Sequence, residues 1–509
     1  MLSERASGIL LHPTSLPGPR GAGDFGADAY LFIDWLVSAG QTYWQMLPVG
    51  EIGPGNSPYM SSSVFAGNIL LVDLEEIASQ GWLSDEHMKP LPEFRPDRIN
   101  FKLLRPYRLE KLRMAAKVFF DASHQGDAQK ETSHAEYLRF CLDENEWLHD
   151  YALFMTLNEQ QNGRDWNHWP SNLANRDPQA LEQIADDFAE EIRFWKFCQW
   201  CFARQWSKLK RYASKQGIRL IGDVPIFAAF QSSDVWAHQE LFELDENGHP
   251  KVVAGVPPDY FSATGQLWGN PLYRWEAHEK TGFSWWISRM RHALKLFDLV
   301  RVDHFRGFAG YWEIPANETT AMNGRWVAGP GEKLFYALET ALGNLPIIAE
   351  DLGMITPDVI ELREKFNLPG MRILQFAFAE DEKHPFLPHN YAPNSVVYTG
   401  THDNDTSIGW WNSATPGEKA FAHKYLGTEG HRIHWDMIKA ISNSGANTVI
   451  ILMQDFLGLT SEHRMNFPGQ PNNNWEWRFT WEQILPEYTQ ELAKFTLDYG
   501  RYNKHITQP

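Results

Sequence analysis

Residues 299–307 read Leu-Val-Arg-Val-Asp-His-Phe-Arg-Gly, a short apolar run that ends in polar residues and a glycine. A β-branched run bounded by a turn signal is typical of a buried β-strand. The two-residue period of a strand places Arg301 and Asp303 on the same side. We therefore expect the guanidinium to keep Asp303 ionised, as a carboxylate nucleophile requires.

Seven further runs of this kind occur along the chain, each ending in polar or turn residues. They cover residues 8–13, 42–49, 219–224, 346–351, 371–376, 395–401 and 448–454. Between them, residues 28–38 and 191–216 carry apolar side chains at helical spacing, and each segment stops at a glycine (Gly40 and Gly217). Strands that alternate with helices favour a parallel sheet, and eight such units predict an α/β fold of the closed (β/α)8 barrel type.

The strands are unevenly spaced, which predicts insertions into a single catalytic barrel that spans residues 1–509. About 170 residues separate the second and third runs, and long stretches without structure of their own are uncommon. We expect a mostly helical inserted subdomain at about 55–190 and a second one at about 228–297, which includes a loop at 255–271. Residues 455–509 are too few for a separate C-terminal β-domain.

Carboxylates follow three of the predicted strands. Asp303 ends the fourth strand, Glu350 the fifth, and Asp403 comes after the seventh. The carboxyl ends of barrel strands form the face at which barrel enzymes work. Two neighbouring carboxyl groups can cleave a glycosidic bond with retention, one as nucleophile and one as acid and base. A metal site at residues 402–405 is a rival interpretation, but no EF-hand or H-E-x-x-H spacing supports it, so we expect no metal.

The composition excludes several classes of protein. The formal net charge is −18, which argues against a nucleic-acid partner. No apolar stretch reaches the length of a membrane span, and the N-terminus lacks signal-peptide character, so we expect a cytoplasmic protein without membrane contact. The spacing of Cys198 and Cys201 favours packing inside a helix over a zinc site. The 70 aromatic residues, among them 22 tryptophans, could include platforms for sugar rings.

The chain resembles the amylomaltase or 4-α-glucanotransferase family of the α-amylase-like clan over essentially its whole length. The resemblance is carried by the segments 8–17, 57–59, 222–226, 255–271, 301–307, 464–469 and 474–475. It implies a retaining enzyme that transfers part of an α-1,4-glucan to the 4-hydroxyl of another glucan or of glucose. The partners would be α-1,4-glucans and malto-oligosaccharides, with no cofactor.

The resemblance also implies roles for ten residues. Asp303 would be the nucleophile, Glu350 the acid and base, and Asp403 the stabiliser of the transition state. The expected substrate-binding residues are Arg301, His402, His304, Tyr59, Asp223, Trp268 and Asn466. The segment 255–271 would cover the active site, with Trp268 as a sugar platform.

Three alternatives stay open at this point. An α-amylase-like hydrolase would use the same carboxylates with water as the acceptor. A branching enzyme of the same clan would form α-1,6 bonds. A catalytically inactive glucan-binding protein would bind glucans without turnover, although it would have no need of a matched nucleophile and acid.

Overall fold

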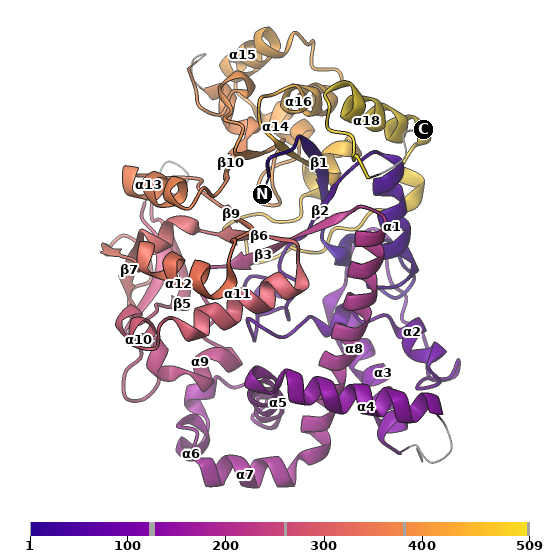
Figure 1. The fold of residues 1–509 in the computed structure, drawn as a ribbon, viewed down its shortest axis with the longest axis vertical. Helices are drawn as coiled ribbons and strands as arrows, with labels where there is room; N and C mark the ends of the chain where they lie inside the picture. Colours follow the sequence, from indigo (N-terminus) through magenta and orange to yellow (C-terminus); the bar gives the residue numbers. More distant parts are fainter. Residues whose placement is uncertain (1, 122–127, 259–261, 380–382, 506–509) are drawn as a thin grey trace.

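The computed structural model describes residues 2–121, 128–258, 262–379 and 383–505, and its centre is a closed barrel of eight parallel strands (Figure 1). The strands follow one another around the barrel in the order β1-β12-β11-β10-β9-β6-β3-β2. Their bounds are β1 Ala6–Leu10, β2 Tyr43–Gln45, β3 Arg219–Pro225, β6 Leu299–Asp303, β9 Ile347–Ala349, β10 Gly370–Ile373, β11 Ser395–Tyr398 and β12 Thr448–Leu452. Each predicted run supplies one of them, which confirms the (β/α)8 barrel.

The barrel strands are apolar because they are covered on both faces. In β12 the sequence Thr-Val-Ile-Ile-Leu is buried at every position, and so are all residues of β1 and β11. β-branched side chains fit this fully packed pleated surface well. The two predicted helices are also present, and each ends before a glycine in the left-handed region, Gly40 at φ 69° and Gly217 at φ 76°.

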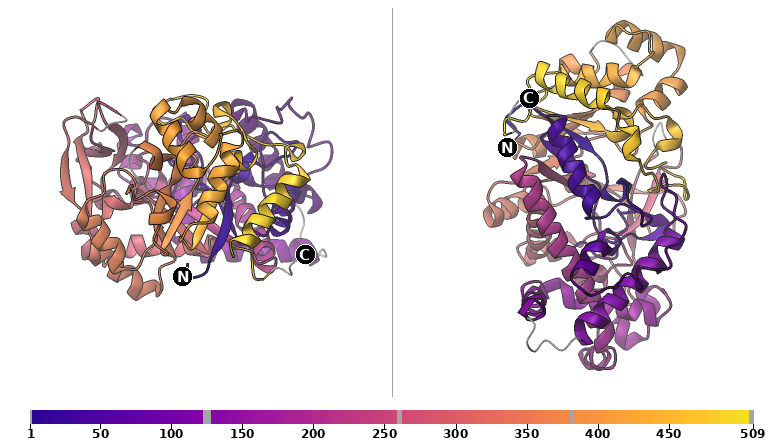
Figure 2. Two further views of the ribbon diagram at one scale, coloured as in Figure 1. Left: turned by 90° about the horizontal axis from the view of Figure 1, so that it is seen from above. Right: turned by 90° about the vertical axis from the view of Figure 1, so that its right-hand side faces the viewer.

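Helices surround the barrel and extend it at both ends of the long axis (Figure 2). No helix within the described ranges has both the length and the apolar character needed to cross a membrane. The helices are α1 Ala27–Ser38, α2 Leu74–Ser79, α3 Phe101–Asp121, α4 Ala128–Asp143, α5 Asn145–Gln160, α6 Ser171–Ala174, α7 Pro178–Asp187, α8 Ala189–Lys215, α9 Ser233–Ala237, α10 Trp275–Lys280, α11 Ser284–Leu296, α12 Glu332–Leu342, α13 Pro357–Lys365, α14 Ser407–Ser413, α15 Pro416–Leu426, α16 Ile433–Ser442, α17 Met453–Phe456 and α18 Pro486–Asp498.

The chain between β2 and β3 is helical and lies at the lower end of Figure 1, where α3 to α7 gather around the long helix α8. Helix α8 contains Cys198 and Cys201 as buried free thiols, which confirms that this pair packs inside a helix. The division into subdomains at about 55–190 and 228–297 stays a prediction.

A second, antiparallel sheet lies beside the barrel, in the order β5-β4-β7-β8. Two of its strands, β4 Val252–Val256 and β5 Gln266–Pro271, come from the predicted insertion between β3 and β6. The other two, β7 Gly310–Pro315 and β8 Arg325–Ala328, follow β6 and were not predicted. Strand β4 pairs with β7 across more than 50 residues of chain, so this sheet joins segments on both sides of the strand that carries Asp303.

A buried arginine near the C-terminus lies at the end of the barrel opposite the predicted active face, where it bonds to several backbone carbonyls. Arg501 is fully buried, and its guanidinium donates hydrogen bonds of 2.8–3.3 Å to backbone carbonyls at the start of β1, at the end of α16 and between α16 and β12. The acceptors are the carbonyls of Ala6, Ser442, Ser444, Ala446 and Asn447. The planar fork of arginine thus gives each of five carbonyls a donor, and three of them, those of Ser442, Ser444 and Asn447, also accept from Arg5 or from the Ala6 N–H.

We expect Arg501→Met to lower the free energy of unfolding by about 3 kcal/mol or more, because five hydrogen bonds from the buried guanidinium to backbone carbonyls are lost at once. Urea unfolding followed by fluorescence would measure this. The matched control is Arg432→Met, which removes a half-exposed ion pair with Glu491 and should cost less than about 1 kcal/mol. Equal losses in both variants would contradict the role given to Arg501.

Candidate active site

Three neighbouring barrel strands bring polar side chains to one point at their carboxyl ends. Asp223 lies on β3, Arg301 and Asp303 lie on β6, and Glu350 directly follows β9. In the parallel register Asp223 stands opposite Arg301, so their side chains leave the sheet on the same face. Arg301 and Asp303 are two residues apart and share that face, as predicted.

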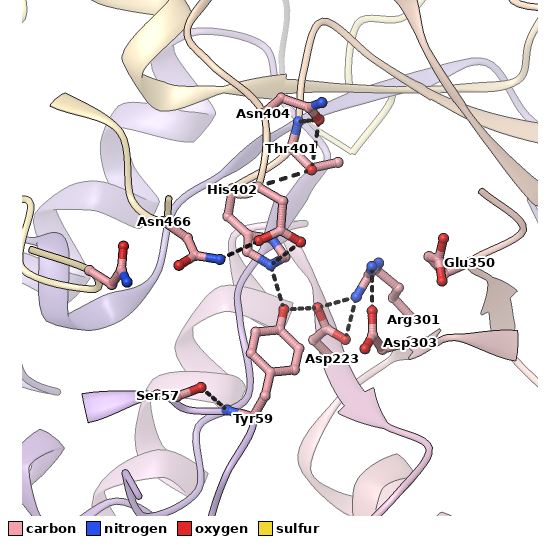
Figure 3. Close-up of polar contacts among 12 residues, drawn as sticks. Ser57, Tyr59, Asp223, Arg301, Asp303, Glu350, Thr401, His402, Asn404 and Asn466 are labelled. Atoms are coloured by element: carbon pink, nitrogen blue, oxygen red, sulfur yellow. Dashed lines mark hydrogen bonds and ion pairs between the residues drawn. The ribbon is translucent and has the colours of Figure 1, made fainter. Parts of the chain in front are cut away.

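Arg301 is the centre of this group (Figure 3). Its Nη1 donates to both carboxylate oxygens of Asp223 at 2.8 and 2.7 Å, and its Nη2 donates to Asp303 Oδ1 at 2.8 Å. The side chains of Asp223 and Arg301 are 1% and 5% exposed, whereas that of Asp303 is 32% exposed. Asp303 is therefore the carboxylate that a molecule entering from solvent can reach.

The buried charges in this group depend on one another. Burial alone would lower the pKa of the Arg301 guanidinium, but Asp223 and Asp303 raise it well above its ordinary value. Burial raises the pKa of Asp223, and Arg301 opposes this rise. Removing either partner would leave an unpaired charge away from water, which is far more costly than losing an exposed ion pair.

Glu350 differs from Asp303 in its surroundings. Burial, followed by the negative charge of Asp303, raises the pKa of Glu350 to about 8. The backbone N–H groups of His304 and Leu352 donate to its two carboxyl oxygens at 2.8 and 2.9 Å. These bonds hold the carboxyl group in place. They also limit the rise of its pKa, because a carboxylate accepts such bonds more strongly than the neutral acid does. At neutral pH Glu350 is mainly protonated.

His304 reaches Glu350 through an uncommon backbone conformation. Its φ and ψ angles are 53° and 46°, in the left-handed region, where residues other than glycine are strained. This turn aims its N–H at Glu350, while its ring lies edge-on to Trp268 with the ring centres 4.8 Å apart. Burial lowers the pKa of the His304 imidazole to about 4, so the ring is neutral at neutral pH.

A chain of polar contacts links Asp223 to the predicted third carboxylate. Tyr59 Oη donates to Asp223 Oδ2 at 2.9 Å and lies 2.9 Å from His402 Nε2. His402 Nε2 is 3.3 Å from Asp403 Oδ2, and Asn466 Nδ2 donates to Asp403 Oδ1 at 2.6 Å. Figure 3 shows this chain on one side of Arg301 and Glu350 on the other. The site between them is bordered by acidic, amide and aromatic groups.

The segment that carries His402 and Asp403 is held at both ends by one buried carboxyl group. Asp455 accepts hydrogen bonds from Thr399 Oγ1 at 2.5 Å, before these residues, and from Ser407 N at 2.6 Å, after them. Asp405 accepts from Ser461 Oγ at 2.9 Å and also from the Thr406 N–H. Asp405 is thus used to cap the turn, which argues against the rival metal interpretation of residues 402–405.

The predicted loop 255–271 runs from the end of β4 through β5, and its residues Asp259, Tyr260 and Phe261 lie outside the described residues. Trp268 on β5 is partly exposed, and its Nε1 donates to Gln266 at 3.1 Å. Its contact with His304 places it beside the group that holds Glu350. All ten residues predicted for the site thus lie in one connected cluster, and their roles stay predictions.

Two further side chains of the cluster had no predicted role. Arg464 Nη2 donates to the backbone carbonyl of Asp403 at 2.9 Å. Trp475 is buried against Tyr59 and His402, with ring centres 5.8 and 5.9 Å away. Both residues fall within the C-terminal segments that carry the family resemblance, which was the one signal that could have indicated them.

Comparison with known proteins shows the family to which this chain belongs. A family model described as 4-alpha-glucanotransferase (glycoside hydrolase family 77) matches residues 11–483. The chain belongs to this family. The 4-alpha-glucanotransferase of Thermus thermophilus is 49% identical over 496 residues, which cover 96% of this chain and 97% of that protein. The chloroplastic or amyloplastic 4-alpha-glucanotransferase of Solanum tuberosum is 44% identical over 98% of this chain and 86% of its own.

Two solved structures share the fold, and the first of them also supports the family. The amylomaltase of Streptococcus agalactiae in complex with acarbose superposes with a TM-score of 0.94 at 36% identity, covering 98% of this chain and all of that one. The amylomaltase of Corynebacterium glutamicum shares the fold with a TM-score of 0.78 at 18% identity, covering 99% of this chain and 75% of that one. The 4-alpha-glucanotransferase family predicted from the sequence is therefore confirmed.

The raised pKa of Glu350 predicts a pH-dependent effect on stability. A glutamate has a pKa near 4.3 in the unfolded chain and about 8 here, so folding takes up a proton between these values. Glu350 therefore destabilises the fold increasingly as pH rises from about 4.5 to 8. We expect Glu350→Gln to be more stable than the natural chain at pH 8, by at most roughly 5 kcal/mol, since a tenfold change in proton affinity corresponds to about 1.4 kcal/mol.

Unfolding curves of both chains between pH 4 and 9 would test this. The difference should be small at pH 4, where the glutamate is protonated in both states, and should level off above about pH 8. A difference that is constant with pH, or one that shrinks as pH rises, would contradict the raised pKa.

Proposed function

We propose that this member of the family is a 4-α-glucanotransferase that works by a retaining double displacement. The observation that carries the proposal is the pairing of two unlike carboxyl groups. Asp303 is held by a guanidinium and open to solvent, whereas Glu350 is protonated at neutral pH. One group is thereby prepared to attack carbon and the other to give a proton.

In the first step, an Asp303 oxygen attacks the anomeric carbon of a bound glucan. The bond from that carbon to the 4-oxygen of the next sugar breaks, and Glu350 gives its proton to this oxygen. A glucanyl ester of Asp303 forms, and the fragment with the reducing end leaves. The ester divides one difficult reaction into two easier ones.

In the second step, the 4-hydroxyl of an acceptor sugar takes the place of the leaving group. Glu350, now ionised, removes its proton, and the oxygen attacks the anomeric carbon from the face opposite Asp303. The ester bond breaks, Asp303 regains its negative charge, and the α-1,4 bond is restored. Each group ends in its starting state, so the cycle needs no cofactor.

The remaining residues support this reaction. Asp403 is half exposed and fixed by Asn466, so it is available to sugar hydroxyls at the reacting ring. Arg301 stabilises the leaving Asp303 carboxylate through its bond to Oδ1. His402 and Tyr59 border the same ring position and orient Asp403 and Asp223. Trp268 offers an apolar face for a neighbouring sugar.

The proposed substrates are α-1,4-glucans and malto-oligosaccharides, with glucose as the smallest acceptor. Support comes from the names of the relatives, which are 42–49% identical, and from the acarbose bound by the Streptococcus agalactiae enzyme. We propose transfer rather than hydrolysis because these relatives are named as transferases. Cytoplasmic location and independence of metal stay predictions from the sequence.

The test is to incubate the purified chain with maltotriose alone and to separate the products by length over time. We expect glucose together with maltopentaose and longer chains, and little rise in total reducing ends. Asp303→Asn should lower the rate at least about a thousandfold, because the nucleophile is lost. The matched control, Asp186→Asn on the exposed face of α7, should keep full activity.

Other outcomes would decide against the proposal. Glucose and maltose with steadily rising reducing ends would indicate a hydrolase on the same barrel. New α-1,6 bonds would indicate a branching enzyme. Glucan binding without turnover would indicate a binding protein. An Asp303→Asn variant that keeps most of its activity would overturn the nucleophile.

A further inference from the structure

A second tryptophan lies at the mouth of the barrel, on the other edge of the sheet that carries Trp268. Trp326 is on β8, which among the described strands pairs with β7 alone in the order β5-β4-β7-β8. Its side chain is 41% exposed, unusual for the largest apolar residue, whose burial normally contributes strongly to stability. We propose that Trp326 is a stacking platform for the acceptor glucan, at a distance of several sugars from the cleaved bond.

The contacts of Arg306 show where Trp326 lies. The Arg306 guanidinium lies over the Trp326 ring, with its central carbon 3.9 Å from the ring centre. The same guanidinium donates to the backbone carbonyls of Met354 and of Gly310. Arg306 comes three residues after Asp303, and Met354 comes four residues after Glu350, so Trp326 lies beside the two turns that carry the catalytic carboxyls.

One of these connections, the hydrogen bond from Arg306 to Met354, runs to the loop that follows Glu350. The Cα atoms of Glu350 and Met354 can be at most about 14 Å apart, because each residue extends the chain by no more than about 3.6 Å. In a retaining enzyme the acid and base stands on the side of the leaving group, and the acceptor later occupies that side. We assign the platform to the acceptor chain because Arg306, which covers the Trp326 ring, is bonded to the loop that follows Glu350. This assignment rests on the proposed function.

The ring is held rigidly, as a platform requires. Arg306 covers one face, and Trp312 on β7 meets the ring edge-on, with centres 5.3 Å apart and planes at 67°. Trp312 is itself anchored, because its Nε1 donates to the carbonyl of Ala321 at 2.8 Å. A ring fixed before binding loses little conformational freedom when a sugar stacks on it.

Two further exposed apolar side chains belong to segments linked to this position. Met322 is in the β7–β8 turn, and Met354 accepts a hydrogen bond from Arg306 through its backbone carbonyl. A contiguous exposed apolar patch is one mark of a ligand-binding surface. The apolar faces of glucose rings are suited to such a surface, and their hydroxyls remain in water.

The test compares acceptors of different length with one donor, maltosyl fluoride, whose transfer is followed by chromatography. For Trp326→Ala we expect the KM for maltotetraose as acceptor to rise about fivefold to tenfold, as the loss of one aromatic stacking contact would produce. The KM for glucose as acceptor should not change, because glucose is too short to reach the platform. Trp326→Phe keeps a ring and should restore most of the affinity for maltotetraose.

The matched control is Tyr336→Ala, which removes an aromatic side chain of similar exposure, 49%, from the outer helix α12. It should change neither KM. Equal KM values for maltotetraose in Trp326→Ala and the natural chain would overturn the platform, and so would an equal rise for glucose. If Trp326→Ala fails to fold, Trp326→Phe and Trp326→Leu are compared instead. A KM for maltotetraose that is as high in Trp326→Phe as in Trp326→Leu would also overturn the platform. Absence of transfer by the natural chain would instead contradict the proposed function.

Discussion

The buried guanidinium of Arg301 is the interaction on which the whole site depends. It stands between Asp223 and Asp303 and neutralises part of two negative charges inside the mouth of the barrel. Without it, the buried Asp223 carboxylate would lie unpaired away from water. With Arg301 in place, Asp303 forms an ion pair and remains partly exposed to solvent, while Glu350 carries the proton at neutral pH. The division of roles between the two carboxyl groups thus begins with one arginine.

The barrel supplies the rigidity that this arrangement needs. Asp223, Arg301 and Asp303 are held by the hydrogen-bond register of β3 and β6, and Glu350 is held by two backbone N–H groups. The strained His304 turn is the part of the site that regular structure does not provide. A left-handed residue between the two catalytic strands costs stability, and it aims an N–H group at the carboxyl that must change protonation state during each proposed cycle.

Much of this could be predicted from the sequence. The eight strands are predictable because each is a buried β-branched run, and Arg301 and Asp303 are predictable as a pair because side chains alternate along a strand. The contact of Arg301 with Asp223 could not be predicted, because it depends on the register between strands 78 residues apart. Nothing in the sequence marks His304 as left-handed, since it is not a glycine. Strands β7 and β8 were missed because the pairing of β7 with β4 is not local, and their short runs lack a clear alternation.

The most direct test of the proposed mechanism is to trap the ester and locate it. Glu350→Gln should still react with maltotriosyl fluoride, because fluoride leaves without a proton, but it lacks the base that activates the acceptor. We predict that the protein gains the mass of one maltotriosyl group, and that peptide mapping finds this group on Asp303. A label on Asp403 or on another residue, or turnover that inverts the anomeric configuration with no labelled protein, would contradict it.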